Sequence, residues 1–146
     1  MSKFRVFTTF VVIALFSASF VYADGNKSRT EELIDKHQSI IDKAKVKDWK
    51  TYADCANDLV SMRICNEEIL SWINKSIEIK ETIFNRTVKG DFLLLAGEYK
   101  NAKKEYVKAI SLAQKSGKKN VIPDLQWKIL IAMGVENYDN FHAAQK

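Results

Sequence analysis

Few side chains in this sequence of 146 residues are placed to do covalent or metal chemistry. His37 and His142 lie near opposite ends of the chain, and no pair of cysteines stands near a pair of histidines at the spacing of a zinc site. No serine lies in the glycine-flanked turn that exposes a hydrolase nucleophile. The adjacent glutamates at 31–32 and 67–68 fall on amphipathic segments, where solvated carboxylates are expected. The sequence therefore predicts a protein that is not an enzyme and that has no cofactor and no metal site, with His37 as a partly covered surface side chain.

Two cysteines, Cys55 and Cys65, are the remaining reactive groups. An unbroken helix would hold side chains ten residues apart at a separation of about 15 Å. A disulfide tolerates a Cα separation of only about 7 Å. The two cysteines can therefore pair only if the chain turns between them, and residues 61–64 are the one place for that turn. We predict the turn and an intramolecular disulfide; the alternative is one continuous helix with two free thiols.

The first 23 residues have the pattern of a cleaved secretory signal. Basic residues precede an apolar run at 10–16, and Val21 and Ala23 occupy the positions that a signal peptidase reads. A membrane anchor is the alternative, but a spanning helix needs about 20 continuous apolar residues. The sequence therefore predicts a signal peptide at 1–23 and one mature domain at 24–146, secreted or, in a bacterium, periplasmic.

The charge of the chain is modest and evenly spread. The net charge of +5 falls by two when Lys3 and Arg5 leave with the signal peptide. The one dense basic cluster, at 115–119, falls where a helix is expected to end, and positive charge suits that end of the helix dipole. Nucleic-acid binding normally needs a patch or a block of one sign. We therefore predict no nucleic-acid partner and no stable membrane anchor after cleavage.

Three sequons offer potential glycan sites if the host is eukaryotic. Their asparagines are Asn26, Asn74 and Asn85. In a chain rich in lysine and asparagine, such triplets also arise by chance, so the sequence leaves their modification open.

The positions of the apolar residues predict helices throughout the mature chain. Apolar residues recur every three or four positions, and alternating strand patterns are almost absent. The residues at 28–31 form a capping box, which predicts a first helix over about 29–46. Pro123 lies where a last apolar helix can begin. The sequence therefore predicts an all-α domain of about five to seven helices in antiparallel pairs.

The stretch VKGDFLLLAGEY at 88–99 contains two glycines with different expected roles. Gly97 is expected to end one helix, so that Tyr99 begins its antiparallel partner. Gly90 costs about 1 kcal/mol relative to alanine inside a helix, and we expect a neighbouring helix to touch the backbone there. The small and aromatic residues that follow resemble the helix pairs of tetratricopeptide repeats, and a weaker unit precedes them by about 33 residues.

Four segments taken in order resemble successive helices of the 14-3-3 family. They are ICNEEIL from Ile64, IFNRTVKGDF from Ile83, EYVKAISLA from Glu105 and VIPDLQWKIL from Val121. The resemblance covers about residues 64–134. It implies stacked antiparallel helix pairs and a groove that binds a phosphorylated peptide.

The phosphate-binding residues of that family have no counterparts here. The family's Arg-Tyr pair after the KGD motif falls on Leu94 and Leu95, and an asparagine of a later helix falls on Ile131. The helix that supplies the other two basic groups of the family is missing. Without guanidinium groups, charge-assisted phosphate binding loses its main source of energy. The resemblance therefore implies the scaffold of the family, without its phosphopeptide site.

A groove, if the scaffold retains one, is expected around Lys89, Asp91, Leu94 and Leu130, although the two leucines fit a core equally well. We predict a secreted, non-enzymatic module that binds a protein or peptide through apolar anchors, with no preference for phosphate. The alternative is a small secreted inhibitor or immunity-type partner protein that binds by its end or convex surfaces. A structural relic of the family is a third reading, and the choice between monomer and homodimer stays open.

Overall fold

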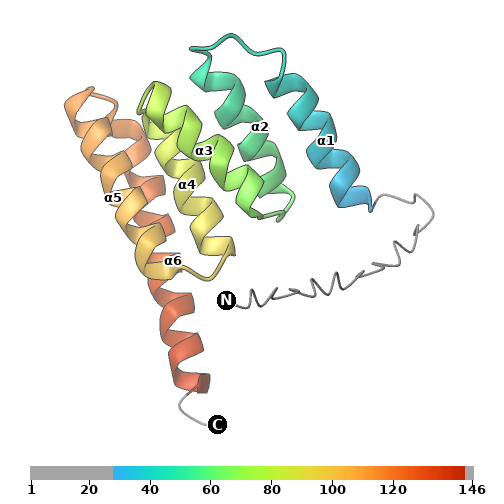
Figure 1. Cartoon of the computed structure of the whole chain (residues 1–146). Coiled ribbons are helices and arrows are strands. Elements are labelled where there is room, and N and C mark those ends of the chain that lie inside the picture. Colours follow the sequence, from blue (N-terminus) through green and yellow to red (C-terminus); the bar gives the residue numbers. More distant parts are fainter. Residues whose placement is uncertain (1–27, 144–146) are drawn as a thin grey trace, which may run out of the picture.

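The computed structural model describes residues 28–143 and contains six α-helices and no strand within that range (Figure 1). The helices are α1 (Arg29–Ile41), α2 (Trp49–Ser61), α3 (Glu67–Ile79), α4 (Ile83–Leu95), α5 (Tyr99–Lys115) and α6 (Ile122–Ala143), with a short 3-10 turn η1 (Lys119–Val121) before α6. The all-α prediction and the predicted number of helices are confirmed. The predicted signal peptide and the sequon at Asn26 lie outside the described residues. Within those residues, no helix is long and apolar enough to cross a membrane.

The helices form a stack in which each helix packs mainly on its neighbours in the sequence. The closest associations are between α2 and α3, between α4 and α5 and between α5 and α6, and α1 packs on α2. A second set of contacts joins α2 and α3 to α4, so that the successive pairs form one continuous core. Figure 1 shows the stack running from α1 at one end to α5 and α6 at the other.

Polar side chains cap the N-terminal ends of α1, α2, α3 and α4. Ser28 and Glu31 form the predicted capping box of α1, and Thr82 and Asn85 form a second one at α4. Such reciprocal bonds satisfy backbone N–H groups that have no partner inside the helix. The first helix ends at Ile41 and not near residue 46, and the side chain of Asp48 accepts a hydrogen bond from the Thr51 backbone to begin α2.

Residues in the left-handed conformation end three of the helices. Gly97, with φ of 78°, follows α4, and Gly117, with φ of 73°, follows α5. The predicted turn at 61–64 is also confirmed, because α2 ends at Ser61 and Arg63 has φ of 62°. Glycine adopts this conformation without strain, whereas a side chain makes it costly, so the sequence signal was strong at 97 and weak at 63.

Gly90 is the predicted point of close approach between helices. A Cβ atom at this position would lie 2.3 Å from Cε1 of Tyr106, so the ring occupies the space that any side chain would need. Tyr106 is fully buried, and its hydroxyl donates to Asp91 Oδ1 over 2.8 Å. Lys128 Nζ donates to the same oxygen over 2.6 Å. One aspartate therefore joins α4, α5 and α6 around the tyrosine ring.

A buried polar chain joins α2, α3 and α4. The Asn85 amide donates to Ser76 Oγ over 3.0 Å and to the Lys80 carbonyl over 2.8 Å, and Ser76 donates to the Trp49 carbonyl over 2.7 Å. Asn85 is 0% exposed, so its amide cannot accept a glycan in the folded protein. Asn74 lies on the surface, so it is the accessible sequon among the described residues.

A largely buried ion pair joins α4 to α5. Arg86 donates to Glu105 over 2.7 Å and to Glu81 over 2.6 Å, and Lys108 donates to the second oxygen of Glu105 over 2.8 Å. The side chain of Glu105 is 8% exposed and that of Arg86 is 15% exposed. Burial raises the pKa of the Glu105 carboxyl, but hydrogen bonds from Lys108 and Arg86 outweigh burial and hold that pKa below its ordinary value. The carboxylate is therefore kept ionised by its two cationic partners.

Candidate functional site

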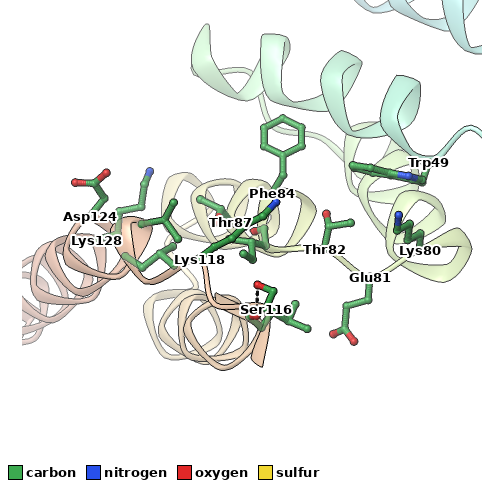
Figure 2. A pocket seen from close by; sticks show the side chains of 14 residues that line it. Trp49, Lys80, Glu81, Thr82, Phe84, Thr87, Ser116, Lys118, Asp124 and Lys128 are labelled. Atoms are coloured by element: carbon green, nitrogen blue, oxygen red, sulfur yellow. Dashed lines mark hydrogen bonds between the residues drawn. The ribbon is translucent and has the colours of Figure 1, made fainter. Parts of the chain in front are cut away.

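A hollow of about 660 Å³ opens where the N-terminal ends of α4 and α6 meet the C-terminal end of α5 (Figure 2). We call this hollow the groove. Its apolar lining residues are Trp49, Ile83, Phe84, Leu112, Val121 and Leu125. Its polar and charged lining residues are Lys80, Glu81, Thr82, Thr87, Ser116, Lys118, Asp124 and Lys128. The volume lies in the range of ordinary ligand sites in proteins.

The helix starts bring the apolar lining together. Trp49 is the first residue of α2, Phe84 is the second residue of α4, and Leu125 lies in the first turn of α6. Figure 2 shows Phe84 between Trp49 on one side and Asp124 and Lys128 on the other. Phe84 is 36% exposed, whereas Leu125 is 3% exposed. The other apolar lining residues are half-buried, so the groove offers a partly covered apolar wall on which Phe84 is the most exposed ring.

The cations of the groove are lysines, and two of them already have partners. Lys128 is bound to Asp91 and also lies 5.9 Å from the centre of the Tyr106 ring. Lys80 Nζ lies 5.7 Å from the centre of the Trp49 ring. Of the two acidic groups, Glu81 is paired with Arg86. No arginine is among the lining residues, so a bidentate guanidinium contact with phosphate is not available there.

The structure does not bring the four predicted groove residues to one place. Lys89 donates to Asn74 over 2.7 Å and lines a separate, smaller hollow of about 390 Å³. Asp91 is engaged by Tyr106 and Lys128, and Leu94 packs partly buried against the core. Leu130 lies on α6 and is 56% exposed.

The groove nevertheless lies on the face of α4 that the sequence indicated. Phe84, Thr87, Asp91 and Leu94 follow one another at spacings of three and four, and such residues share one face of a helix. Leu95 is partly buried against the core, Ile131 is 39% exposed on α6, and neither lines the groove. The groove therefore lies about two turns nearer the start of α4 than Asp91 and Leu94, the α4 residues that the sequence indicated together with Lys89. The sequence feature that marks the groove is a bulky apolar residue at or just after the starts of α2, α4 and α6.

Both cysteines are free thiols in the structure, so the predicted disulfide is absent. The buried Sγ of Cys55 lies on α2 and faces the His37 carbonyl of α1 at 3.9 Å. Cys65 is exposed in the connection after the α2 turn. The turn that pairing required is present, but one sulfur points into a helix interface and the other lies in solvent.

Native protein is expected to react with a thiol reagent at Cys65 only. Burial raises the pKa of the Cys55 thiol, and the nearby carboxylates of Asp58 and Asp54 raise it further, so Cys55 is both covered and protonated at neutral pH. Titration with a chromogenic disulfide should show one fast equivalent, and a second only after unfolding. The Cys65→Ser protein should lose the fast equivalent. If neither cysteine reacted in protein that was unfolded without a reducing agent, the disulfide between Cys55 and Cys65 would be present after all.

His37 is buried and not partly exposed as predicted. It is 7% exposed, and its Nδ1 lies 2.7 Å from the Leu33 carbonyl oxygen. Its Nε2 lies 3.6 Å from Asp58 Oδ2, across the contact between α1 and α2. The ring therefore helps to hold α1 on α2. Among residues 28–143, no group of three or more His, Cys, Asp or Glu side chains could hold a metal ion.

Comparisons of the chain with protein-family models, with curated proteins and with solved structures each found no match. The resemblance to 14-3-3 proteins therefore depends on the four sequence segments alone.

Proposed function

We propose that this chain is a secreted, non-enzymatic module that binds a protein or peptide segment in the groove. The observation that carries the proposal is the groove itself, where three helix starts bring apolar side chains to an open hollow with lysines around it. Apolar surface removed from water contributes about 25 cal/mol per Å². A partner that places an apolar side chain beside Phe84 would gain this energy.

The resemblance to the 14-3-3 family supports a binding scaffold. The segments from Ile83, Glu105 and Val121 lie in α4, α5 and η1–α6, and the segment from Ile64 leads into α3. The proposal differs from that family in the ligand. A phosphate in the groove would meet lysines but no arginine, and two of those lysines are already engaged, Lys128 by Asp91 and Lys80 by the Trp49 ring. Without a guanidinium group, the bidentate contact that strengthens phosphate binding is missing. Binding should therefore depend on apolar anchors and not on phosphorylation.

Peptide binding in the groove is expected to weaken about 10-fold when Phe84 is replaced by alanine, because the exposed ring is the main apolar contact open to a partner. Short peptides selected from a random displayed library on purified protein supply the probes. Calorimetry then measures the dissociation constant of each synthetic peptide, with and without a phosphate on one serine.

Val107→Ala is the matched control, because Val107 is an exposed apolar residue of α5 that does not line the groove. Equal weakening by both variants would argue against the groove as the binding site. A large gain in affinity on phosphorylation would overturn the apolar-anchor proposal.

A further inference from the structure

The solvent-exposed side of α5 is basic along its whole length. Residues 99–119, which form α5 and the turn after it, contain seven lysines and one acidic residue, Glu105. The formal charge of this segment, +6, exceeds the +5 of the whole chain. The fold buries Glu105 in its ion pair and leaves most of the lysines exposed. The positive charge is therefore concentrated on one helix, and is not evenly spread as we predicted from the sequence.

Five exposed residues of α5 form one surface, which we call the basic face. They are Lys100, Lys104, Val107, Lys108 and Lys115. Spacings of three, four and seven place them on the same side of a helix. The face is about 22 Å long at 1.5 Å per residue. Figure 1 shows α5 on the outside of the stack, so the face is open to a partner.

The centre of the basic face is a shallow apolar hollow surrounded by lysines. Val107 is 55% exposed and is the one apolar residue that lines this hollow of about 610 Å³. The other lining residues are Lys100, Lys103, Lys104 and Lys108. A partner that fits this surface carries negative charge and also has apolar groups for the valine.

Carboxylates lie around the basic face and not on it. Two of them, Glu105 and Glu136, are bound to cations. Glu98 and Asp139 lie toward the start of α5, and Asp124 lies among the groove residues beyond its end. The face can therefore lie along a negatively charged surface without placing a carboxylate against it.

Most lysines of the basic face are unpaired. The ammonium groups of Lys100, Lys104 and Lys115 have no hydrogen bond or ion pair within residues 28–143, whereas Lys108 is bound to Glu105. A lysine ammonium is a point charge on a flexible stem. Since nothing fixes these charges in space, they suit a partner whose own charges can move to meet them.

These features favour a lipid bilayer over other anionic partners. Nucleic-acid sites commonly use arginine forks and aromatic rings, and the basic face has neither. A sulfated polysaccharide offers little apolar surface to Val107, and an acidic protein would have to hold its carboxylates at matching positions. Anionic lipids diffuse to the cations, and their acyl chains lie beneath the headgroups. Clusters of roughly four to eight basic residues on a helix are typical of binding to acidic lipids.

We propose that the basic face of α5 binds the surface of a lipid bilayer that contains anionic headgroups. The helix lies along the surface, its lysines contact headgroup phosphates and carboxylates, and Val107 enters the interfacial layer. The contact is peripheral and is reversed by salt. None of the five residues lines the groove, so lipid binding is separate from peptide binding there.

Sedimentation of the purified full chain with vesicles tests the proposal. The protein should bind vesicles of phosphatidylcholine and phosphatidylserine, and bind vesicles of phosphatidylcholine alone at least 10-fold more weakly. Binding should fall as salt is added, because the screening length contracts from about 10 Å at 0.1 M to about 3 Å at 1 M.

Variants of exposed side chains locate the contact. The double variant Lys100→Gln with Lys104→Gln should weaken vesicle binding about 5-fold for each lysine removed, while Lys100→Arg with Lys104→Arg should retain it because the charge is kept. Val107→Gln should weaken it about 3-fold, since less apolar surface enters the bilayer. The matched control is Lys45→Gln with Lys47→Gln, which removes the same charge from the connection between α1 and α2. All variants share residues 1–23, so any binding by that segment cancels in the comparison.

Three outcomes would contradict the proposal, provided that circular dichroism shows the helix content unchanged. Equal binding to vesicles with and without phosphatidylserine would exclude charge as the cause. Equal weakening by the two lysine-to-glutamine pairs would mean that net charge matters and the basic face does not. Tighter binding to heparin or polyglutamate than to vesicles, with no effect of Val107→Gln, would assign the face to a soluble polyanion.

Discussion

Replacing Arg86 with methionine is expected to lower the free energy of unfolding by about 3 to 5 kcal/mol at neutral pH, the usual cost of breaking a buried ion pair on one side. Methionine keeps most of the side-chain volume but removes the charge. The Glu105 side chain, which is 8% exposed, then keeps Lys108 as its one cationic partner among the described residues. Urea unfolding followed by circular dichroism measures the loss.

The cost of this substitution should shrink in acid. Because the folded protein holds the pKa of Glu105 below its ordinary value, the carboxylate contributes stability above the unfolded pKa of about 4.3. That contribution is lost as the pH falls through the lower folded pKa. Once Glu105 is protonated, Arg86 has no charge to neutralise there, and the two proteins should approach each other in stability.

Two further variants separate charge from packing. The double variant Arg86→Met with Glu105→Leu removes both charges of the buried pair. It should recover most of the unfolding free energy that Arg86→Met alone loses. Lys50→Met breaks the solvent-exposed pair with Asp54 and should produce no measurable change. A loss at Arg86→Met that is as large at low pH as at neutral pH would point to lost packing of the arginine stem.

Gly90→Ala is expected to destabilise the protein by about 2 to 3 kcal/mol, near the top of the usual range for overpacking. The new methyl group would lie 2.3 Å from a carbon of the Tyr106 ring. That ring is fully buried and anchored through its hydroxyl to Asp91, so it cannot move aside. The clash outweighs the gain of about 1 kcal/mol in helix propensity. Urea unfolding again provides the measurement.

A double-mutant cycle checks the cause. With Tyr106 replaced by leucine, the space beside residue 90 opens, and adding Gly90→Ala should become neutral or favourable. Gly134→Ala is the matched substitution at an open helix position and should stabilise the protein by about 0.5 to 1 kcal/mol. The same penalty for Gly90→Ala in both tyrosine and leucine backgrounds would rule out the ring contact as its source.

Local chemistry made the helices and their ends predictable. The capping box at Ser28, the stop at Gly97 and the close contact at Gly90 all depend on a few neighbouring residues or on the size of one side chain. Such features are encoded within a turn or two of the chain. The turn before Cys65 was predicted from spacing alone, and Arg63 supplies it without a glycine.

The position of the groove and the state of the two thiols were harder to predict, because both depend on the directions that side chains take after packing. Cys55 faces α1 and Cys65 faces solvent, a difference that their spacing along the chain does not contain. Likewise, Asp91 was expected at a groove but is bound to Tyr106 and Lys128. The predicted groove residues came from the positions that bind phosphate in the 14-3-3 family. The groove in the structure lies nearer the start of α4, beside Phe84.

Because of the way in which α1 joins the stack, the free energy needed to open a helix locally differs from one end of the protein to the other. The helix packs mainly on α2, whereas α4 is held by α2, α3 and α5. Segments with few neighbours open locally at a lower free energy than the molecule as a whole. Detachment of α1 would bare the His37 side chain and the Cys55 thiol without disturbing α4, α5 and α6. Among the six helices, amide exchange should therefore be fastest in α1. The rate at which a thiol reagent modifies Cys55 should follow the local opening of α1 and not the global unfolding of the protein.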